Sequence, residues 1–338
     1  MATVYEVITA RLVEQLEAGA APWNKPWAAG AGAEALPRNL ISGKPYRGIN
    51  TWLLMAAGYA RPWFLTFNQA RELGGTVRKG EHGLPVVFWK LDAGKAKGKG
   101  KAEGKAEGED TTGAADGTRF NGRRVMCRYY TVFNVDQCEG LRVQPAAPVD
   151  APSAPKFNPI DAAEGIVNGW TARPEIRHGG GVACYTPFFD TVRMPAPESF
   201  TSTEFYYSTL FHELGHSTGH EKRLARPGVV ECKGFGSAVY SREELVAEMT
   251  AAYLCGLSGI SNAQTEQNSA AYLQSWIKVL KGDARLALVA AGQAQKAADL
   301  ILGTAAPSAQ PDTGATADPD PGAELDPGAV ELADLVEA

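Results

Sequence analysis

Apolar side chains in the middle of the chain recur at the spacing of an α-helix. Tyr207, Leu210, Phe211 and Leu214 are separated by intervals that place them along one helical face. Residues 201–204, Thr-Ser-Thr-Glu, have the form of a capping box just before this stripe. The pattern therefore predicts a helix that starts at the box and buries its apolar stripe.

Other segments have their own periodicities. Residues 1–15 are amphipathic and predict an N-terminal helix, and a further helix is expected from about residue 241 through Leu254. Residues 85–91 and 124–134 are strand-like runs. Residues 179–187 predict a strand interrupted by Pro187, hence an edge strand, and an edge can pair with an extended peptide or be covered.

Three segments of biased composition divide the chain. Residues 95–117 are rich in Gly, Ala, Lys and Glu and predict a flexible loop, residues 144–156 a Pro/Ala linker, and residues 304–338 a disordered acidic tail. The sequence therefore predicts an α+β protein of two domains, one spanning residues 1–143 and the other residues 157–303.

Composition narrows the class of protein. No apolar run is long enough to span a bilayer, and five scattered cysteines without a C-x-x-C pair are typical of reduced thiols. We therefore expect a cytoplasmic protein with no membrane partner. Residues 1–150 hold 20 basic and 15 acidic side chains, whereas residues 151–338 hold 13 basic and 23 acidic ones. The N-terminal half is thus the basic half.

The strongest chemical signal is an H-E-x-x-H pattern inside the predicted central helix. His212 and His216 are four residues apart and so point both imidazoles at one ion, while Glu213 lies beside the ion without binding it. Zinc held in this way keeps an open position for water, and the glutamate acts as the base in amide hydrolysis. The alternative is that both histidines are ordinary helix residues paired with acids or water.

A catalytic zinc usually takes a third protein ligand, and several residues are candidates. His220 would be turned about 80° away from the other two on a continuing helix, which makes it a poor choice, and Cys232 is another candidate. We expect Glu244 as ligand and Glu248 as a hydrogen-bond partner of a histidine, with Glu243 or Glu248 as alternative ligands.

Two further roles near this second helix stay open. The pattern Ser241-x-x-Glu244 is itself a capping box, so Glu244 has the alternative of closing a helix end. Tyr240 is a candidate donor to a developing oxyanion, with a plain core tyrosine as its alternative. The predicted metal is Zn²⁺, and Mn²⁺, Co²⁺ or Ni²⁺ suit the same donors in vitro.

Basic and aromatic residues are interleaved through the N-terminal half. Such a mixture lets rings stack on exposed bases while cations follow the phosphates, which favours single-stranded nucleic acid as a ligand. The alternative is that most of these rings form a hydrophobic core.

Several long motifs resemble a known family. Residues 39–50 (NLISGKPYRGIN), 64–70 (FLTFNQA), 77–81 (VRKGE) and 132–137 (VFNVDQ), followed by 212–220 and 240–248, are similar to ArdC-type antirestriction proteins in the same order. The likeness runs from residue 3 to about 303 and extends to the N-terminal part of plasmid TraC primases. The loop at 95–117 and the acidic tail depart from the family pattern.

The resemblance implies a single-stranded-DNA-binding first domain and a zincin-like metallopeptidase second domain. It also implies a protein of a mobile element that protects incoming DNA from host restriction. On this basis we expect two groups of DNA contacts. The phosphate-binding candidates are Lys44, Arg47, Arg78 and Lys79, and the stacking candidates are Tyr46, Trp52 and Trp63, any of which has a core role as its alternative.

Three functions follow. In the first, DNA binding delivers a peptidase to an unidentified protein substrate, such as a DNA-bound host protein. In the second, the chain coats single-stranded DNA without proteolysis, and its metal only stabilises the fold. In the third, it assists a primase, as the TraC likeness suggests, although the sequence lacks an obvious polymerase-type acidic motif.

Overall fold

The computed structural model describes residues 2–17, 36–91, 119–120, 123–142, 159–230, 238–260 and 269–304. The loop expected at 95–117, the linker expected at 144–156 and the tail expected after Thr304 lie outside these residues. No helix in the described ranges is long and apolar enough to cross a membrane.

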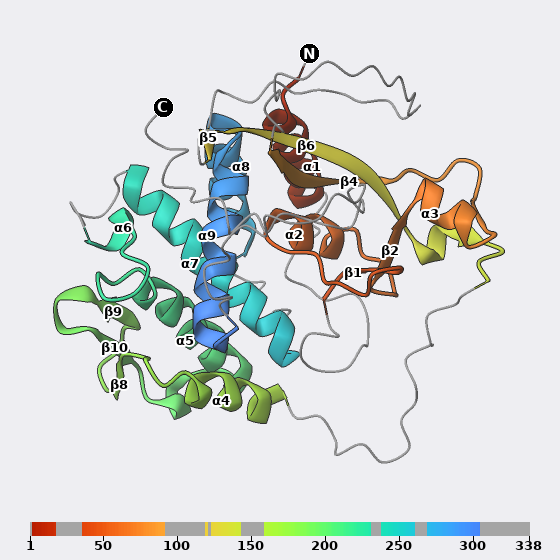
Figure 1. Cartoon of the computed structure of the whole chain (residues 1–338). Helices are drawn as coiled ribbons and strands as arrows, with labels where there is room; N and C mark the ends of the chain where they lie inside the picture. The colour runs from red at the N-terminus through yellow and green to blue at the C-terminus, as the bar shows by residue number, and fades with distance from the viewer. Residues whose placement is uncertain are drawn as a thin grey trace, which may run out of the picture.

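The N-terminal half is built on a mixed sheet with the order β1-β2-β6-β4 (Figure 1). Its long strands are β4 (Leu84–Leu91) and β6 (Arg123–Asn134), which pair antiparallel and confirm the two predicted strand runs. The shorter β1 (Arg38–Asn39) runs parallel to β2 (Trp63–Thr66), and β5 (Arg119–Phe120) pairs with the start of β6. A small ladder joins β3 (Thr76–Val77) to β7 (Cys138–Glu139).

Three helices accompany this sheet. α1 (Val4–Glu17) confirms the predicted N-terminal helix, and α2 (Ile49–Met55) packs against β4. α3 (Phe67–Glu72) follows β2 directly, because the Thr66 hydroxyl accepts a hydrogen bond from the Gln69 backbone while the Gln69 side chain accepts one from the Thr66 backbone. A reciprocal capping box thus ends the strand and starts the helix.

The C-terminal half is mainly helical. α5 (Thr203–Ser217) packs against α7 (Ala238–Ser258), which in turn packs against α9 (Leu286–Leu302), and α4 (Pro159–Gly169) contacts all three. α8 (Ser269–Gly282) packs against α1, and the short α6 (Pro227–Val230) packs against α7. A small sheet lies beside α5. Its strands have the order β8 (Glu175–His178), β10 (Thr191–Met194) and β9 (Cys184–Thr186).

The predicted edge strand is shorter than expected. Of residues 179–187 only β9, Cys184–Thr186, is a strand, and it lies at one edge of its sheet. The start of α5 also differs in detail, because Ser202 rather than Thr201 is the N-cap and accepts a hydrogen bond from the Phe205 backbone at 3.1 Å. The sequence Thr-Ser-Thr offers several caps, and local periodicity alone does not choose among them.

A large apolar cluster joins the two halves of the chain. It includes Ile8 of α1, Trp52 of α2 and Trp89 of β4, together with Met249 of α7 and Leu280 of α8. Polar contacts reinforce this interface, since the Thr9 hydroxyl donates to the Ala284 carbonyl at 2.7 Å and the Gly48 amide donates to Gln295 Oε1 at 3.1 Å. The C-terminal helices are therefore partly covered by the N-terminal half.

Candidate metal centre

The two helices that carry the predicted site approach each other closely at one glycine. A Cβ atom built on Gly215 of α5 would lie 3.1 Å from the backbone of Ala247 on α7 and 3.3 Å from the Thr250 Cβ atom. These distances are tighter than ordinary van der Waals contact. Gly215, which lies between Glu213 and His216, therefore lets α7 come close enough for its carboxylates to reach the histidines.

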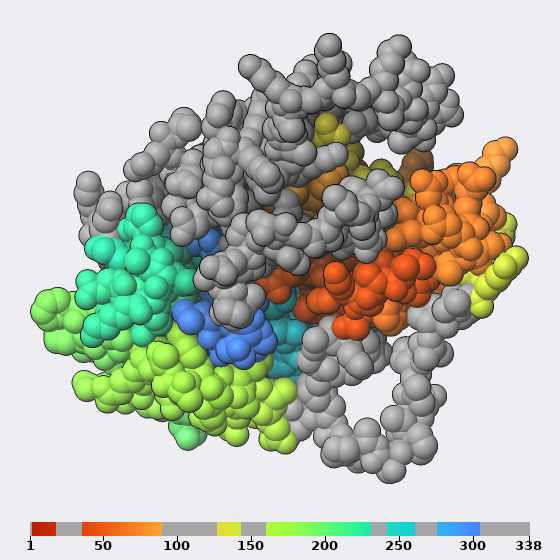
Figure 2. All heavy atoms as spheres, viewed as in Figure 1, coloured from red at the N-terminus to blue at the C-terminus, as the bar shows by residue number. Residues whose placement is uncertain are grey.

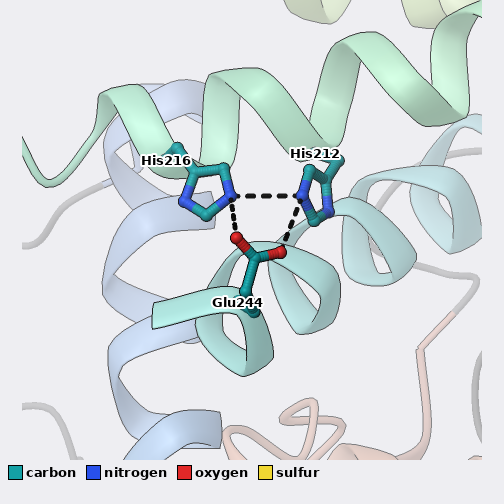
Figure 3. A group of neighbouring side chains, drawn as sticks. All are labelled: His212, His216 and Glu244. Atoms are coloured by element: carbon teal, nitrogen blue, oxygen red, sulfur yellow. Dashed lines mark hydrogen bonds and ion pairs between the residues drawn. The ribbon is translucent and has the colours of Figure 1, made fainter. Parts of the chain in front are cut away.

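Three donor side chains meet at this crossing (Figure 3). His212 and His216 extend from α5, and Glu244 extends from α7 toward both rings. The two Nε2 atoms lie 3.1 Å apart, Glu244 Oε2 lies 3.5 Å from His212 Nε2, and Glu244 Oε1 lies 3.4 Å from His216 Nε2. Among the described residues, this is the one group of three or more metal-binding side chains whose ligand atoms lie within 4.8 Å of one another.

These spacings fit a small divalent ion. Zinc–nitrogen bonds of about 2.0–2.1 Å at tetrahedral angles place neighbouring ligand atoms about 3.3 Å apart. The three distances between the ligand atoms, 3.1, 3.4 and 3.5 Å, lie close to that value. Two imidazoles and one carboxylate also form one of the donor sets that zinc takes in peptidases, with a fourth position left open. The Glu244 side chain is 27% exposed, so solvent reaches this side of the centre.

The outward-facing nitrogen of His212 is held by a second carboxylate. His212 Nδ1 lies 2.9 Å from Glu248 Oε2, which is the supporting position that the sequence predicts for Glu248. Burial lowers the pKa of His212, but hydrogen bonds to Glu244 and Glu248 outweigh it and raise the pKa to about 10. These hydrogen bonds favour the protonated ring, whereas a metal ion binds the deprotonated nitrogen.

His216 is held by a longer chain of contacts. Its Nδ1 atom lies 3.3 Å from Glu243 Oε1, and Arg226 grips the same carboxylate through Nε at 2.9 Å and Nη2 at 2.6 Å. Burial raises the pKa of Glu243, yet the hydrogen bonds from Arg226 and His216 reverse this and lower the pKa overall. Glu243 is one residue from Glu244 and five residues from Glu248 in sequence, but it contacts His216 Nδ1 instead of joining the donors.

Arg226 is the residue that sequence reasoning missed. Its side chain is 5% exposed, and besides Glu243 it donates to Thr218 Oγ1 at 2.6 Å and to the Gly215 carbonyl at 2.8 Å. It thereby ties the end of α5 to the start of α7. No motif in the sequence points to this arginine, because its partners lie in separate segments.

Glu213, the predicted base, is 8% exposed and makes no hydrogen bond within the described residues. Its oxygens are not among the fully buried polar atoms that lack a partner, so they still reach solvent. Its charge is close enough to contribute to the raised pKa of His212. The carboxylate is therefore accessible to a water molecule.

The remaining candidates fall away from the centre or outside the described residues. The His220 ring accepts a hydrogen bond from the Lys222 backbone at 3.2 Å and is not among the grouped donors. Glu244 is not a helix cap, because α7 begins at Ala238. Cys232 is outside the described residues, as is the side chain of Tyr240, whose backbone belongs to the first turn of α7.

The stacking candidates of the N-terminal half are mostly core residues. Tyr46 is 3% exposed and Trp52 is 5% exposed, and both belong to apolar clusters. Neither ring has an exposed face for a base to stack on, so the prediction that Tyr46 and Trp52 contact DNA is wrong. Trp63 is half-buried, with the Arg38 guanidinium 5.4 Å from its ring centroid.

The phosphate-binding candidates divide into paired and unpaired cations. Arg47 bonds to Asp299 of α9 and so joins the two halves, and Arg78 Nη2 lies 2.7 Å from Glu81 Oε1. Lys44 and Lys79 are exposed and make no ion pair within the described part of the chain. Only the two lysines are thus fully available to a polyanion.

Comparisons with known proteins match one family model to each half of the chain. The family model for the N-terminal domain of anti-restriction factor ArdC matches residues 2–133, and that for a zincin-like metallopeptidase matches residues 161–293. The crystal structure of the antirestriction ArdC protein from the R388 plasmid with Mn(II) bound is 35% identical, with a TM-score of 0.61 over 90% of this chain and 99% of that one. The chain belongs to the ArdC antirestriction family.

Two curated relatives extend the comparison. The protein y4eC of Sinorhizobium fredii is 36% identical over 301 residues, covering 88% of this ArdC-family chain and 90% of y4eC. DNA primase TraC of Escherichia coli is 36% identical over 299 residues, but the chain spans only 27% of TraC. The α+β fold with two matched domains is confirmed, and the zincin-like domain implies a divalent metal.

Proposed function

We propose that this ArdC-family chain binds single-stranded DNA and carries a zinc-dependent peptidase centre, and that it protects incoming DNA from host restriction in the cytoplasm. The observation that carries the catalytic part is the convergence of His212, His216 and Glu244 beside a buried Glu213 without a hydrogen-bond partner. The DNA-binding and protective parts rest on the family membership and on the unpaired surface cations.

Each residue has a definite task in this proposal. His212, His216 and Glu244 would hold the ion, which when bound polarises a peptide carbonyl and makes water more acidic. Glu213 would accept the proton of the attacking water and return it to the leaving amine. Glu248 and Glu243 orient the two imidazoles, and this fixes which ring nitrogen of each faces the ion.

The substrate would be a protein segment in extended conformation. β9 pairs with β10 on one side and, among the described strands, with nothing on the other. A free strand edge in contact with α5 is suited to backbone pairing with such a segment. We propose a DNA-bound host protein as the target, because DNA binding by the same chain would bring the two together.

The substitution Glu213→Gln separates proteolysis from binding. It preserves side-chain size and removes the base, so zinc content and DNA affinity should match the wild type while protection of transferred DNA is lost. The readout is the survival of unmodified DNA in restricting cells, with His212→Ala as the metal-free comparison. Full protection by Glu213→Gln would contradict the peptidase role.

That outcome would favour a second function, a protein that coats single-stranded DNA and uses its metal to stabilise the fold. The observation on its side is the buried network of Arg226 and Glu243, which links the centre to the packing of α5 and α7. Loss of protection in His212→Ala but not in Glu213→Gln is the result expected from this alternative. A primase-accessory role would instead appear as altered primer synthesis.

A further inference from the structure

Two large apolar side chains remain on the surface of the described N-terminal half. Ile41 is 51% exposed and Phe67 is 46% exposed, whereas the other large apolar side chains described there are buried or half-buried. Isolated exposed apolar residues are normal, but neighbouring ones mark interaction sites. Whether these two are neighbours therefore decides their meaning.

The topology brings them to the same edge of the sheet. β1 and β2 are parallel, with Asn39 opposite Phe64, so the residues that follow each strand emerge side by side. Ile41 follows β1 and Phe67 follows β2. The Asn39 side-chain amide donates to Gln69 Oε1 at 3.1 Å, which fixes the loop after β1 against α3. Figure 2 shows the described N-terminal half as adjoining red-orange and orange surfaces.

Unpaired cations accompany the apolar pair. Arg71 lies four residues after Phe67 on α3, so the two side chains share a helical face, and both are exposed. Lys44 is exposed at the end of the loop that carries Ile41. Neither cation makes an ion pair within the described residues, unlike Arg47, Arg61 and Arg78.

The nearest acid on the same helix does not cancel this charge. Glu72 follows Arg71 directly, and one residue along a helix rotates a side chain by about 100°. Arg71 thus stays beside the ring of Phe67 while Glu72 faces another direction. The face combines the exposed ring of Phe67, the exposed aliphatic side chain of Ile41 and two cations, Arg71 and Lys44, that make no ion pair within the described residues.

We infer that Phe67 and Ile41 form a stacking platform for an unpaired base of single-stranded DNA, with Arg71 and Lys44 binding the flanking phosphates. This inference rests on the proposed DNA-binding function and assigns it a location. A ring face takes an unpaired base because stacking needs the base to be out of a duplex. The platform also replaces the buried Tyr46 and Trp52 as the stacking element.

The test compares full-length variants in a fluorescence anisotropy titration with a labelled, mixed-sequence single-stranded oligonucleotide. We expect Phe67→Ser to weaken binding about fivefold or more, since one base stacked on an aromatic ring contributes at least that much. Phe67→Trp should keep the affinity of the wild type, because it retains an aromatic ring. The matched control is Phe188→Ser with Phe189→Ser, two exposed rings at 89% and 66% exposure in the turn after β9.

Salt dependence distinguishes the two kinds of contact. The slope of log affinity against log salt should stay unchanged in Phe67→Ser and should fall by about 1.4 in the double variant Lys44→Gln, Arg71→Gln, because each phosphate contact to a single strand contributes about 0.7. Thermal melting of each variant checks that the fold is retained.

Three outcomes are informative. If the wild-type chain fails to bind single-stranded DNA, the proposed function itself is contradicted. If it binds, and Phe67→Ser binds as well as the control variant, DNA binds elsewhere and this inference is overturned. A loss confined to Phe67→Ser and the cation variant, with duplex of the same sequence bound more weakly, supports the platform.

Discussion

The metal centre and the N-terminal face differ in how their polar groups are held. At the centre, His212 and His216 each have a carboxylate behind the ring, and one of these carboxylates is gripped by buried Arg226. On the N-terminal face, Arg78 is paired at the surface and Lys44 is unpaired. A buried network positions a small ion, whereas exposed surface cations suit a long and flexible polyanion.

The largest expected effect of a single substitution is at Arg226, in the buried network of the metal centre. Arg226→Met leaves Glu243 buried without its partner, and removal of one member of a buried pair costs about 3–5 kcal/mol. Urea unfolding of the metal-free protein measures the effect. Arg78→Met on the N-terminal face, which removes an exposed pair, should leave the unfolding midpoint unchanged. Equal midpoints for both variants would show that the Arg226 network does not stabilise the fold.

Loss of a donor is the next largest effect. His216→Ala should weaken zinc binding by about two to four orders of magnitude, because a zinc-binding free energy of about 10–16 kcal/mol shared among three or four ligands gives about 2.5–5 kcal/mol for each. Competition with a chromophoric chelator measures this affinity. Single-stranded DNA affinity should be unchanged, and a parallel loss of DNA binding would show that the two regions are not independent.

The support behind His212 should matter less than a donor. Glu248→Gln keeps a hydrogen-bond acceptor but removes the charge, and loss of such partners typically lowers metal affinity about 10–100-fold. The same chelator competition applies, with exposed Glu198→Gln as the matched control. An unchanged affinity in Glu248→Gln would mean that the contact with His212 does not orient the ring.

The pH dependence of stability and of zinc binding should follow the raised pKa of His212. Its pKa is raised to about 10 in the metal-free fold, so the stabilisation that it brings is complete below its unfolded value of 6.5 and is lost as pH rises through about 10. Zinc must displace this proton. The increase in melting temperature caused by zinc should therefore grow from pH 6 to pH 9, and a constant increase would contradict proton competition.

The smallest effect is expected at the contact between the two halves. Arg47 and Asp299 are partly exposed, at 30% and 13% of their side-chain surface, so Arg47→Ala should cost about 1 kcal/mol or less. DNA affinity should change little, because Asp299 already neutralises this arginine. A large loss of DNA binding would place Arg47 among the DNA contacts after all.

The same contrast explains how far the sequence could predict the structure. The H-E-x-x-H spacing places two rings on one face whenever the segment is helical, and Glu244 and Glu248 follow the same rule on α7. Helical spacing depends only on nearby residues, so the sequence could predict which of these side chains share a helical face. Arg226 and Gly215 escaped notice because their roles arise only where α5 crosses α7.

The aromatic residues of the N-terminal half show the opposite case. The sequence shows that aromatic and basic residues are interleaved, but it does not reveal which aromatic rings are exposed to solvent. Trp52 is buried because α2 is covered by the C-terminal helices, which lie far away in sequence. Phe67 is exposed because a capping box turns the chain into α3 at that residue. Burial depends on tertiary packing, which residue spacing alone does not encode.

The most direct test of the metal centre is zinc K-edge X-ray absorption on the zinc-loaded full chain. The spectrum should show one ion per chain with nitrogen and oxygen neighbours at about 2.0–2.2 Å, including the outer-shell signature of two imidazoles. His216→Ala should lose one imidazole from this signature. A sulfur neighbour at about 2.3 Å, or three imidazoles in place of two and a carboxylate, would contradict the assignment of His212, His216 and Glu244.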